Sequence, residues 1–464
     1  MLWKKFLRRR RCLPDSVTPL WRILYWFYRF TSWLRYATER RFTSAGLVVL
    51  IAVGVAAVMG PDTENNVAYQ AVPLLLSFLM LAIGFGWLFR GQFAAERVLP
   101  RFGTVGEPFT YSVLLRNLGR KQQTGLTLLE NLADPRPGFK DWLAAQKAEE
   151  KSMRAFRVSQ HRRTHPFKVA RLKPAAIPAA AAGENVTVEV ELVPMRRGLL
   201  RFGGITLART DPLGLFCAFH KLSLPQSALI LPRRYPLPPI DLPGTMRYQK
   251  GGVALATSVG RSDEFVSLRD YRHGDPIRHI HWRSWARAGK PVVREFEDEF
   301  FVRHALVLDT FVEHPQSEVF EEAVSVAASF ACGVLTQESL LDLLFVGNQS
   351  YCFTSGRGLA HADQMLEILA SVRPCSEHQF EALETLVINH SSLVSGCICI
   401  FLAWDKERQR FVEKLKMLGL PVMVLVIVEA GGKKGLELGA MQDDPARFHV
   451  LEVGKVKEGL AKFK

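Results

Sequence analysis

The sequence predicts a multi-domain protein that combines a two-helix transmembrane hairpin, a β-sandwich module and an α/β parallel-sheet domain. Two uncharged apolar segments lie at residues 44–60 and 71–89. Strand-like alternation is frequent over residues 98–235, and apolar strands alternate with helices over residues 301–464. A chain of 464 residues has room for all three parts.

Each apolar segment is close to the roughly 20 residues with which a helix crosses a hydrocarbon core. The connection between them, "PDTENNVAYQ", is short and polar. The pair therefore predicts a helical hairpin through a membrane. A secretory signal peptide does not fit, because a long basic stretch precedes the first segment and a second segment follows it. The alternative is a pair of buried helices in a soluble protein.

The positive charge of the chain is concentrated at its N-terminus. Residues 1–41 contain eleven Lys and Arg residues against two acidic residues, so they hold +9 of the formal net charge of +15. Three arginines follow the second apolar segment, whereas the connection between the segments has no basic residue. The positive-inside rule therefore predicts a multi-pass protein with both termini in the cytoplasm.

Residues 1–43 form a basic cytoplasmic or interfacial segment. Within it, "LWRILYWFYRFTSWLRY" (20–36) interleaves arginines with aromatic residues. Such side chains suit the headgroup layer, where rings lie half-buried and arginines meet phosphates. The stretch predicts an anchor helix on the lipid bilayer. The alternative is a helix that only leads into the first span and packs on the hairpin.

Residues 98–235 predict a small antiparallel sandwich. "EPFTYSVLLRN" and "ENVTVEVELVP" alternate as strands do, and Gly, Pro and Asn bound them. Residues 134–183 interrupt this pattern with the helical "WLAAQKAEEKSMRAF" and the low-complexity "PAAIPAAAAG", which indicates an insertion or mobile loop. The Pro-rich stretch 231–244 then links the module onward.

Residues 301–464 repeat a β–α order. "HALVLD", "LLDLLFVG", "CICIFLAW" and "PVMVLVIV" are apolar strands with helical patterns between them. This order predicts a parallel sheet that helices cover on both faces. Ligands bind such sheets beyond the carboxyl ends of the strands, where Asp309 and Asp405 fall.

One stretch between these modules is dense in polar hydrogen-bonding residues: "RDYRHGDPIRHIHWRSWAR", residues 269–287. Asp275 suits a helix N-cap, and Pro276 suits the first helical position. Gly289 suits a left-handed C-terminal stop. Residues 276–288 are therefore expected to form one short helix, and "VVREFEDEFF" after it a strand.

The pattern R-x-Y-x-x-G-D-x-x-R-x-I-x-W-x-x-x-A-R, followed by V-R-E-F-E and an apolar strand ending in Asp, resembles the bacterial family called domain of unknown function 58 (DUF58). The twin apolar segments, "RRGLLRFGG" and "DPLGLF" are also similar to that family, so the resemblance covers nearly the whole chain after residue 43. His281 and Trp285 depart from the pattern, which weakens any role that needs a carboxylate or hydroxyl there. The matching positions are Arg269, Tyr271, Gly274, Asp275, Arg278, Ile280, Trp282, Ala286 and Arg287.

The resemblance implies a von Willebrand factor A-like fold for residues 301–464. It also implies a bacterial inner-membrane location. The partners that it implies are MoxR-type AAA+ ATPases and other von Willebrand-type proteins.

A von Willebrand-type metal site needs D-x-S-x-S after the first strand, so that an Asp and two hydroxyls hold Mg²⁺. Both serine positions are lost here, because Phe311 and Glu313 stand two and four residues after Asp309. Asp309 is thus a degenerate metal-site position, expected to cap a helix or order a loop. We expect no metal and no other cofactor. The seven cysteines contain no C-x-x-C pair and predict no disulfide or zinc site.

The alternative function is a hydrolytic enzyme that uses the Arg/His/Asp motif at 269–287. His273, His279 and His281 with Asp275 would form its cluster, but His279 and His281 are two apart and face away from each other on a helix. The sequence has no G-x-S-x-G, H-E-x-x-H or P-loop. Nucleic-acid binding is not expected, because three glutamates follow the motif and the positive charge is mostly N-terminal.

The remaining interpretation of the region 236–300 is a structural clasp that also receives a partner. Arginine forks pair with carboxylates in a fixed geometry, and Arg and Trp are frequent interface anchors. Trp282 is expected to fill the apolar centre. The function expected is a non-enzymatic scaffold or adaptor that works with a MoxR-type ATPase in envelope-related complex assembly. The candidate residues are Arg269, Tyr271, Gly274, Asp275, Arg278, Trp282, Arg287 and Glu295.

Overall fold

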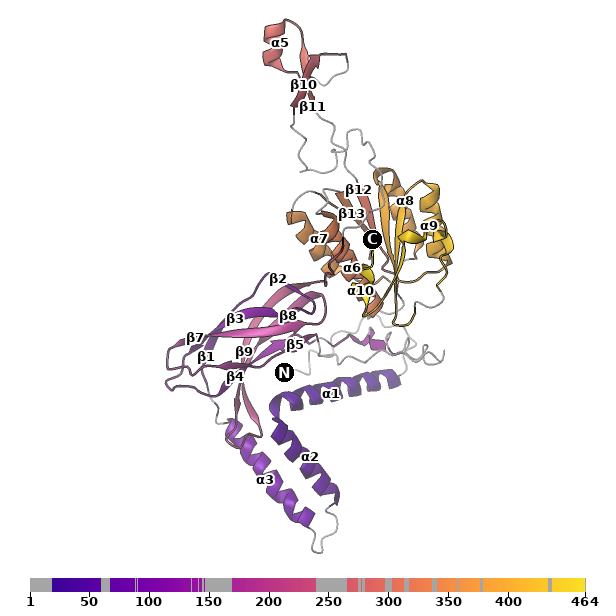
Figure 1. Ribbon diagram of the computed structural model, residues 1–464. Helices are drawn as coiled ribbons and strands as arrows, with labels where there is room; N and C mark the ends of the chain where they lie inside the picture. The colour runs from indigo at the N-terminus through magenta and orange to yellow at the C-terminus, as the bar shows by residue number, and fades with distance from the viewer. Residues whose placement is uncertain are drawn as a thin grey trace. The chain divides into compact units, whose positions relative to one another are not determined.

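A computed structural model of the chain (Figure 1) describes residues 19–59, 67–238 and 265–463, with gaps inside the last two ranges. The chain divides into two compact units, Met1–Leu231 and Pro232–Lys464. The gaps are residues 88, 90, 135, 141, 144–145, 147–168, 274–276, 278–279, 297–302, 313–316, 336–339, 357–358, 376–378 and 433–435.

Three helices begin the first unit: α1 (Pro19–Arg41), α2 (Ser44–Met59) and α3 (Val67–Trp87). α2 and α3 are apolar and lie side by side (Figure 1). Within α3, Gln70–Trp87 is long and apolar enough to cross a membrane by length and composition, whereas the apolar Ser44–Val58 in α2 is shorter. The expected first span, 44–60, and the transmembrane topology of the hairpin therefore stay predictions.

Two β-sheets pack face to face after the helices. One has the strand order β1-β3-β7-β5 and the other the order β2-β9-β8-β4-β6. The strands are β1 (Phe93–Val98), β2 (Phe102–Thr104), β3 (Phe109–Asn117), β4 (Leu126–Leu132), β5 (Ala170–Leu172), β6 (Ala175–Ile177), β7 (Asn185–Pro194), β8 (Gly198–Thr210) and β9 (Cys217–Leu231).

The core of this sandwich follows from the period-two pattern of its strands. In β3 and β7 alternate residues are buried, because successive side chains of a strand point to opposite faces. Residues from both sheets meet between them, among them the fully buried Leu115, Leu192, Ile205 and Ile230. The sandwich starts five residues before the expected position 98, because Phe93 in β1 already enters this core.

Residues 134–183 are not a single insertion, which corrects the sequence-based expectation. β5 and β6 lie within this range and pair with β7 and β4. Ala180 is fully buried and forms a bridge with Gln123, so the alanine-rich stretch is part of the sheet. Small side chains fit there against the neighbouring strands. Residues 139–146 begin a helix where they are described, and the rest of the expected helix, 147–156, lies outside the described residues.

A buried ion pair joins the two sheets. Arg97 in β1 donates to both carboxylate oxygens of Glu130 in β4, at 3.3 and 2.8 Å, and the two side chains are 0% and 1% exposed. The same guanidinium donates to the Leu224 carbonyl and to Gln226 Oε1 in β9. Burial raises the pKa of Glu130, and the charge of Arg97 opposes that rise. Since a lone buried charge is costly, both sheets must be packed before these groups are satisfied.

A tight turn, "DPLGLF", connects β8 to β9 and is closed by Asp211. The carboxylate of Asp211 accepts hydrogen bonds from the backbone N–H groups of Leu213, Leu215 and Phe216, at 2.9, 2.7 and 2.6 Å. Gly214 has a positive φ of 71°, a conformation that glycine adopts without steric cost. One buried carboxylate therefore determines the shape of the whole turn.

This turn also attaches the apolar helices to the sandwich. Thr43, between α1 and α2, donates from its hydroxyl and its amide to carbonyl oxygens of the turn, at 2.5 and 3.2 Å. Phe42 and Phe216 form an antiparallel bridge, with ring centroids 5.4 Å apart. A Cβ at Gly46 in α2 would collide with the Leu215 carbonyl oxygen, so the close approach requires glycine.

The Pro-rich stretch after β9 begins the second unit and packs on a helix of that unit. Tyr235 donates its amide to Ser329 Oγ at 2.8 Å and its hydroxyl to Glu322 Oε2 at 2.6 Å, both in α6 (Glu318–Leu335). Burial is the main cause of the raised pKa of Tyr235 and of Glu322. The expected end of the sandwich module, residue 235, therefore moves back to Leu231.

The second unit contains a sheet with the strand order β14-β13-β12-β15-β16-β17. Five of its strands are parallel, and β14 (Ser350–Ser355) pairs antiparallel with β13. The parallel strands are β12 (Arg303–Leu308), β13 (Leu340–Val346), β15 (Gly396–Phe401), β16 (Val422–Val428) and β17 (Phe448–Glu452). The helices are α6, α7 (Leu359–Ser371), α8 (Glu381–His390), α9 (Lys406–Met417) and α10 (Val456–Leu460), with short turns η2 (Ser391–Leu393), η3 (Gly439–Met441) and η4 (Pro445–Arg447).

The central strands are buried on both faces, as their continuous apolar sequences indicate. Figure 1 shows α6 and α7 on one face of the sheet and α8 and α9 on the other. Ala305 and Val307 of β12 belong to the core beneath α8 and α9. β14 and β17 were not expected from the sequence, because these short outer strands lack a continuous apolar run.

We predict that Asp211→Ala lowers the free energy of unfolding by about 1.5–3 kcal/mol, because three amide donors lose a charged acceptor. Asp211→Asn keeps one acceptor oxygen and should lose less. Thermal unfolding of the full-length protein in detergent measures both. The control is Glu189→Ala on β7, where the side chain is exposed. Equal melting temperatures for Asp211→Ala and this control would contradict the role of the turn.

Candidate functional site

The Arg/Trp stretch forms a small hairpin with a helix in its connection. β10 (Phe265–Asp270) pairs antiparallel with β11 (Val292–Phe296), and α5 (Trp282–Ala288) lies between them in the sequence. Val292 and Val293 are buried beneath this helix. Gly289 ends α5 with a positive φ of 67°, and its amide donates to the Trp285 carbonyl at 3.0 Å. The expected glycine stop is therefore present.

The helix begins later than residue 276, which corrects the expected start. The residue before its first turn is His281, and Asp275 lies outside the described residues. Ile280 forms a bridge with Val293, and the His281 amide donates to the Val292 carbonyl at 2.8 Å. Pairing with β11 therefore places Ile280 and His281 directly before the first turn of α5. His281 Nδ1 lies 2.6 Å from the hydroxyl of Ser284 in the first turn.

Trp282 does not fill an apolar centre, contrary to the expectation. Its side chain is 61% exposed and stacks on Trp285, with ring centroids 5.2 Å apart and planes 17° from parallel. Ile277 and Leu268 of the same hairpin are exposed as well. The hairpin thus presents a flat aromatic surface with aliphatic neighbours, where the sequence suggested a packed interior.

Basic side chains surround this aromatic surface. Arg283 and Arg287 in α5 are exposed, and within the described residues Arg287 makes no ion pair. Lys290 pairs with Asp270 at 2.7 Å, but both side chains are more than 60% exposed, so the pair contributes at most about 1 kcal/mol. The clasp expected through Arg287 is therefore not found in this part of the hairpin. We name Trp282, Trp285, Arg283 and Arg287 the Arg/Trp surface.

The other predicted residues of the motif lie as follows. Arg269 is half-buried in β10 and donates to the Asp270 carbonyl at 3.3 Å. The Tyr271 amide donates to the Pro291 carbonyl at 3.0 Å. Glu295 pairs with Ser267 in the strand register, and its side chain lies outside the described part of the molecule. Gly274, Asp275 and Arg278 lie outside the described residues too, as does His279 of the hydrolytic alternative.

Asp309, at the carboxyl end of β12, is fully buried and orders three segments. Its Oδ1 accepts from the Phe311 amide at 3.0 Å, and its Oδ2 accepts from the Leu402 amide at 3.2 Å. Arg408 Nε donates to the same Oδ2 at 2.7 Å. These contacts agree with the expected loop-ordering role and add a cation that the sequence did not indicate.

Arg408 occupies the place where a cation would neutralise the Asp309 carboxylate. Its Nη1 pairs with Asp405 Oδ2 at 2.5 Å, and its guanidinium lies 4.9 Å from the centroid of the Phe380 ring. Burial lowers the pKa of Arg408, but Asp309 and Asp405 raise it, and on balance the pKa is raised. Within the described residues, no group of three or more His, Cys, Asp and Glu side chains could hold a metal ion. The residues at this sheet edge do not fit a von Willebrand-type metal.

α1 has two different faces, and one of them packs on the segment after β4. Trp21, Tyr25 and Tyr28 surround Trp142, with ring centroids 6.1, 5.4 and 5.9 Å from it. Arg40, the penultimate residue of the helix, donates to Asn131 Oδ1 at 2.8 Å. This face of the helix rests on the sandwich module, which the sequence had not placed there.

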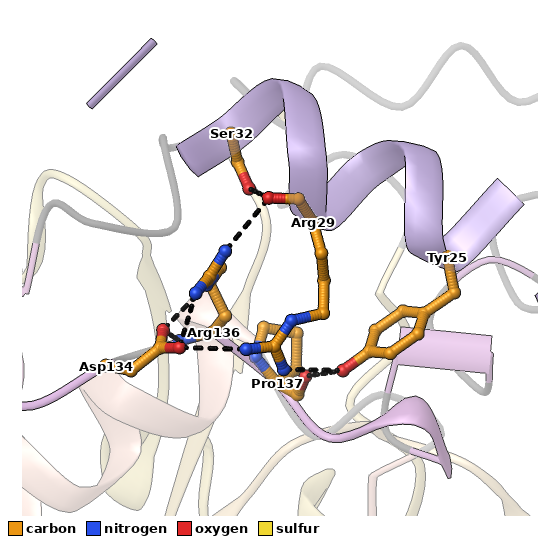
Figure 2. A network of polar contacts seen from close by, with 6 residues as sticks. All are labelled: Tyr25, Arg29, Ser32, Asp134, Arg136 and Pro137. Carbon is orange, nitrogen blue, oxygen red and sulfur yellow. Dashed lines mark hydrogen bonds and ion pairs between the residues drawn. The ribbon is translucent and has the colours of Figure 1, made fainter. Parts of the chain in front are cut away.

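Figure 2 shows the polar contacts that orient this helix. Arg29 Nη2 pairs with Asp134 Oδ2 at 3.1 Å, and Arg136 Nη2 pairs with the same oxygen at 2.6 Å. Arg136 Nη1 donates to the Arg29 carbonyl at 3.0 Å, and the Tyr25 hydroxyl donates to the Pro137 carbonyl. The hydrogen bond from Arg136 lowers the pKa of Asp134. One carboxylate thus connects α1 to the loop by two arginines.

The opposite face of α1 carries an exposed apolar stripe at helical spacing. Such a face is typical of a helix that lies in the interface of a bilayer. Its side chains are 43–64% exposed, and they are Leu20, Ile23, Leu24, Trp26, Phe27, Phe30, Trp33 and Leu34.

Residues 267–422 match the family model described as "Protein of unknown function DUF58". The chain contains a DUF58 region. The match covers the Arg/Trp hairpin from Ser267 onward and the sheet as far as Val422, so both belong to one family unit. The resemblance is thereby confirmed over residues 267–422, and for the apolar segments, "RRGLLRFGG" and "DPLGLF" it stays a prediction.

A Bacillus subtilis relative, "Uncharacterized protein YeaD", is 27% identical over 190 residues. The match covers 40% of this chain and 46% of that relative, so it spans less than half of the relative's length.

Two solved structures overlap with about a third of the chain. The CARDB domain of a Pyrococcus furiosus protein covers 30% of this chain and 94% of its own at 9% identity, with a TM-score of 0.16. A PapD-like domain of human CEP192 covers 30% and 84% at 12% identity, also with a TM-score of 0.16. Likenesses this weak support no conclusion on fold or function.

Sequence reasoning missed Arg408, Arg97 and Asp134, which make the main ion pairs. Each pairs with a residue in another element, and no local motif marks such pairs. The available signal was weak. Arg408 stands three residues after Asp405, which caps α9. The Asp405 carboxylate accepts a hydrogen bond from the Arg408 amide at 3.0 Å.

We predict that Arg408→Ala lowers the free energy of unfolding by about 3–5 kcal/mol, because it leaves the Asp309 carboxylate buried without a counter-charge. Arg410→Ala is the matched control, since Arg410 is exposed on the same helix. Chemical denaturation of the full-length protein measures both variants. A loss below 1 kcal/mol for Arg408→Ala would show that the carboxylate has another counter-charge.

Proposed function

We propose that this protein is a non-enzymatic scaffold or adaptor at the bacterial inner membrane, working with a MoxR-type AAA+ ATPase in envelope-related complex assembly. The observation that carries the proposal is the Arg/Trp surface. Exposed Trp and Arg side chains are the residues that most often dominate binding energy at protein interfaces. The exposure of a stacked Trp pair to solvent is explained if a partner covers these rings.

Two further features support an adaptor rather than a catalyst. The cation position at the end of β12 is taken by Arg408, so a von Willebrand factor A-like domain here would bind without a metal. The described histidines of the motif do not form a catalytic group either: His281 contacts Ser284, and His273 is exposed. The proposed partner class comes from the DUF58 resemblance.

The apolar helices support the membrane part of the proposal. α3 has the length and composition of a span, and α2 packs against it. α2 has 16 residues, which rise about 24 Å, so local thinning of the bilayer or the flanking residues must complete a second span. The basic residues before α2 and after α3 place both termini in the cytoplasm in this proposal.

The partner prediction is that Trp282→Ala weakens capture of the MoxR-type ATPase by about thirtyfold, the loss expected for an interface anchor worth 2 kcal/mol. Because Trp282 is exposed, the melting temperature should stay that of the parent. The measurement is binding of the purified ATPase to the full-length protein in detergent. The control is Met417→Ala, which removes an 84% exposed side chain from α9. Unchanged binding by Trp282→Ala, or no binding by the parent, would contradict the proposal.

The topology prediction is that reporters fused after Tyr69 and after Lys464 lie on opposite sides of the membrane. Charge asymmetry across the apolar helices should place the first outside and the second in the cytoplasm. Paired alkaline phosphatase and fluorescent-protein fusions measure the side directly. Phosphatase activity at Lys464 would rule out this orientation.

A further inference from the structure

A cleft of about 400 Å³ lies where α3 meets the sandwich. Phe85 lines it from the last turn of α3 and Phe89 from the segment after that helix, and Arg209 and Thr210 line it from the end of β8. One wall is thus aromatic and continuous with an apolar helix, while the other is polar and cationic. A cleft with these two walls suits an amphipathic ligand.

The guanidinium of Arg209 is the cationic group that lines the cleft. Its side chain is exposed, it lies 6.0 Å from the centroid of the Phe89 ring, and it makes no ion pair within the described residues. The acid that lines the cleft is Asp211, and its carboxylate already accepts three backbone N–H groups of the turn. The Asp211 carboxylate is thus directed into the turn, and the guanidinium of Arg209 is the cationic donor that the cleft offers to a ligand.

A second arginine lies against the other face of the same strand pair. Arg41, the last residue of α1, lies 5.9 and 5.6 Å from the ring centroids of Phe216 and Phe219 and makes no ion pair within the described residues. Phe219 pairs with Ala208 in the register, one step from Arg209, so the two arginines flank opposite faces of the β8–β9 pair. Arg41 lies shortly before the start of α2, and Arg209 lies beside Phe89, shortly after the end of α3.

The apolar wall extends away from the cleft along α3. Leu74, Phe78, Leu81 and Phe85 follow each other at helical spacing and are 40–58% exposed. This stripe leads from the middle of the helix to the cleft. An acyl chain lying on it would bring its headgroup to Arg209.

We propose that the cleft binds a glycerophospholipid with a net negative headgroup, whose phosphate pairs with Arg209 and whose acyl chain lies along the α3 stripe. Guanidinium and phosphate form charge-assisted bidentate hydrogen bonds, which are stronger than neutral ones. A zwitterionic lipid binds less well, because its own cation competes with Arg209 for the phosphate. This inference rests on the proposed insertion of α3 into a membrane.

The test is native mass spectrometry of the full-length protein in detergent, titrated separately with phosphatidylglycerol, phosphatidylcholine and inorganic phosphate. The parent should bind one phosphatidylglycerol more tightly than phosphatidylcholine, and inorganic phosphate should not displace it. Arg209→Gln should weaken phosphatidylglycerol binding by about tenfold or more, as expected when hydrogen bonds to a charged group are lost. Arg209→Lys should retain part of the affinity, since Lys binds phosphate as a point charge.

The matched control is Arg201→Gln, an exposed arginine eight residues earlier on β8 and about 25 Å from the cleft. It should bind the lipid like the parent. Equal binding by Arg209→Gln and the parent would overturn the site, and equal affinity for both lipids would overturn the charge selectivity. Displacement by inorganic phosphate alone would overturn the acyl part of the proposal.

Membrane fractionation separates failure of this inference from failure of the proposed function. A parent chain recovered in the soluble fraction would refute the membrane anchor and this inference with it. A chain that stays in the membrane under alkaline extraction but fails the lipid titration would refute the lipid site alone.

Discussion

The buried carboxylate of Asp211 is the constraint on which the attachment of the apolar helices to the sandwich depends. It closes the β8–β9 turn with three hydrogen bonds. Carbonyl oxygens of that turn accept from Thr43, which precedes α2, and the ring of Phe216 packs on Phe42. The apolar helices are therefore attached to a rigid edge of the sandwich. Because Asp211 is satisfied inside the turn, it also leaves the charge of the nearby Arg209 available to a ligand.

The arginines of the described residues fall into two groups with opposite surroundings. Arg97, Arg408 and Arg136 are paired with carboxylates and hold sheets, strand ends or α1 in place. Arg287, Arg209 and Arg41 are exposed and make no ion pair within the described residues. The first group matters for the fold because the loss of one partner would leave the opposite charge unpaired, at greatest cost where that charge is buried. The second group is suited to partners that supply the missing negative charge.

The errors of sequence interpretation share a physical cause. Asp275 and Pro276 carry the signature of a helix start, but Ile280 and His281 pair with β11, so α5 begins only at Trp282. The alanine-rich stretch before Gly183 has the composition of a loop, yet small side chains fit a sheet edge. In both places a contact with a distant segment outweighs a local preference of modest size.

The sequence by itself determined the four inner strands of the sheet in the second unit, the alternating strands of the sandwich, the glycine stop at Gly289 and the DUF58 motif. These follow from local periodicity and turn chemistry, which act within a few residues. Only the tertiary structure decided that Arg408 neutralises Asp309, that Trp282 faces solvent and that one face of α1 rests on the sandwich. Such pairings join residues about a hundred positions apart, and their energy depends on desolvation, which no local pattern records.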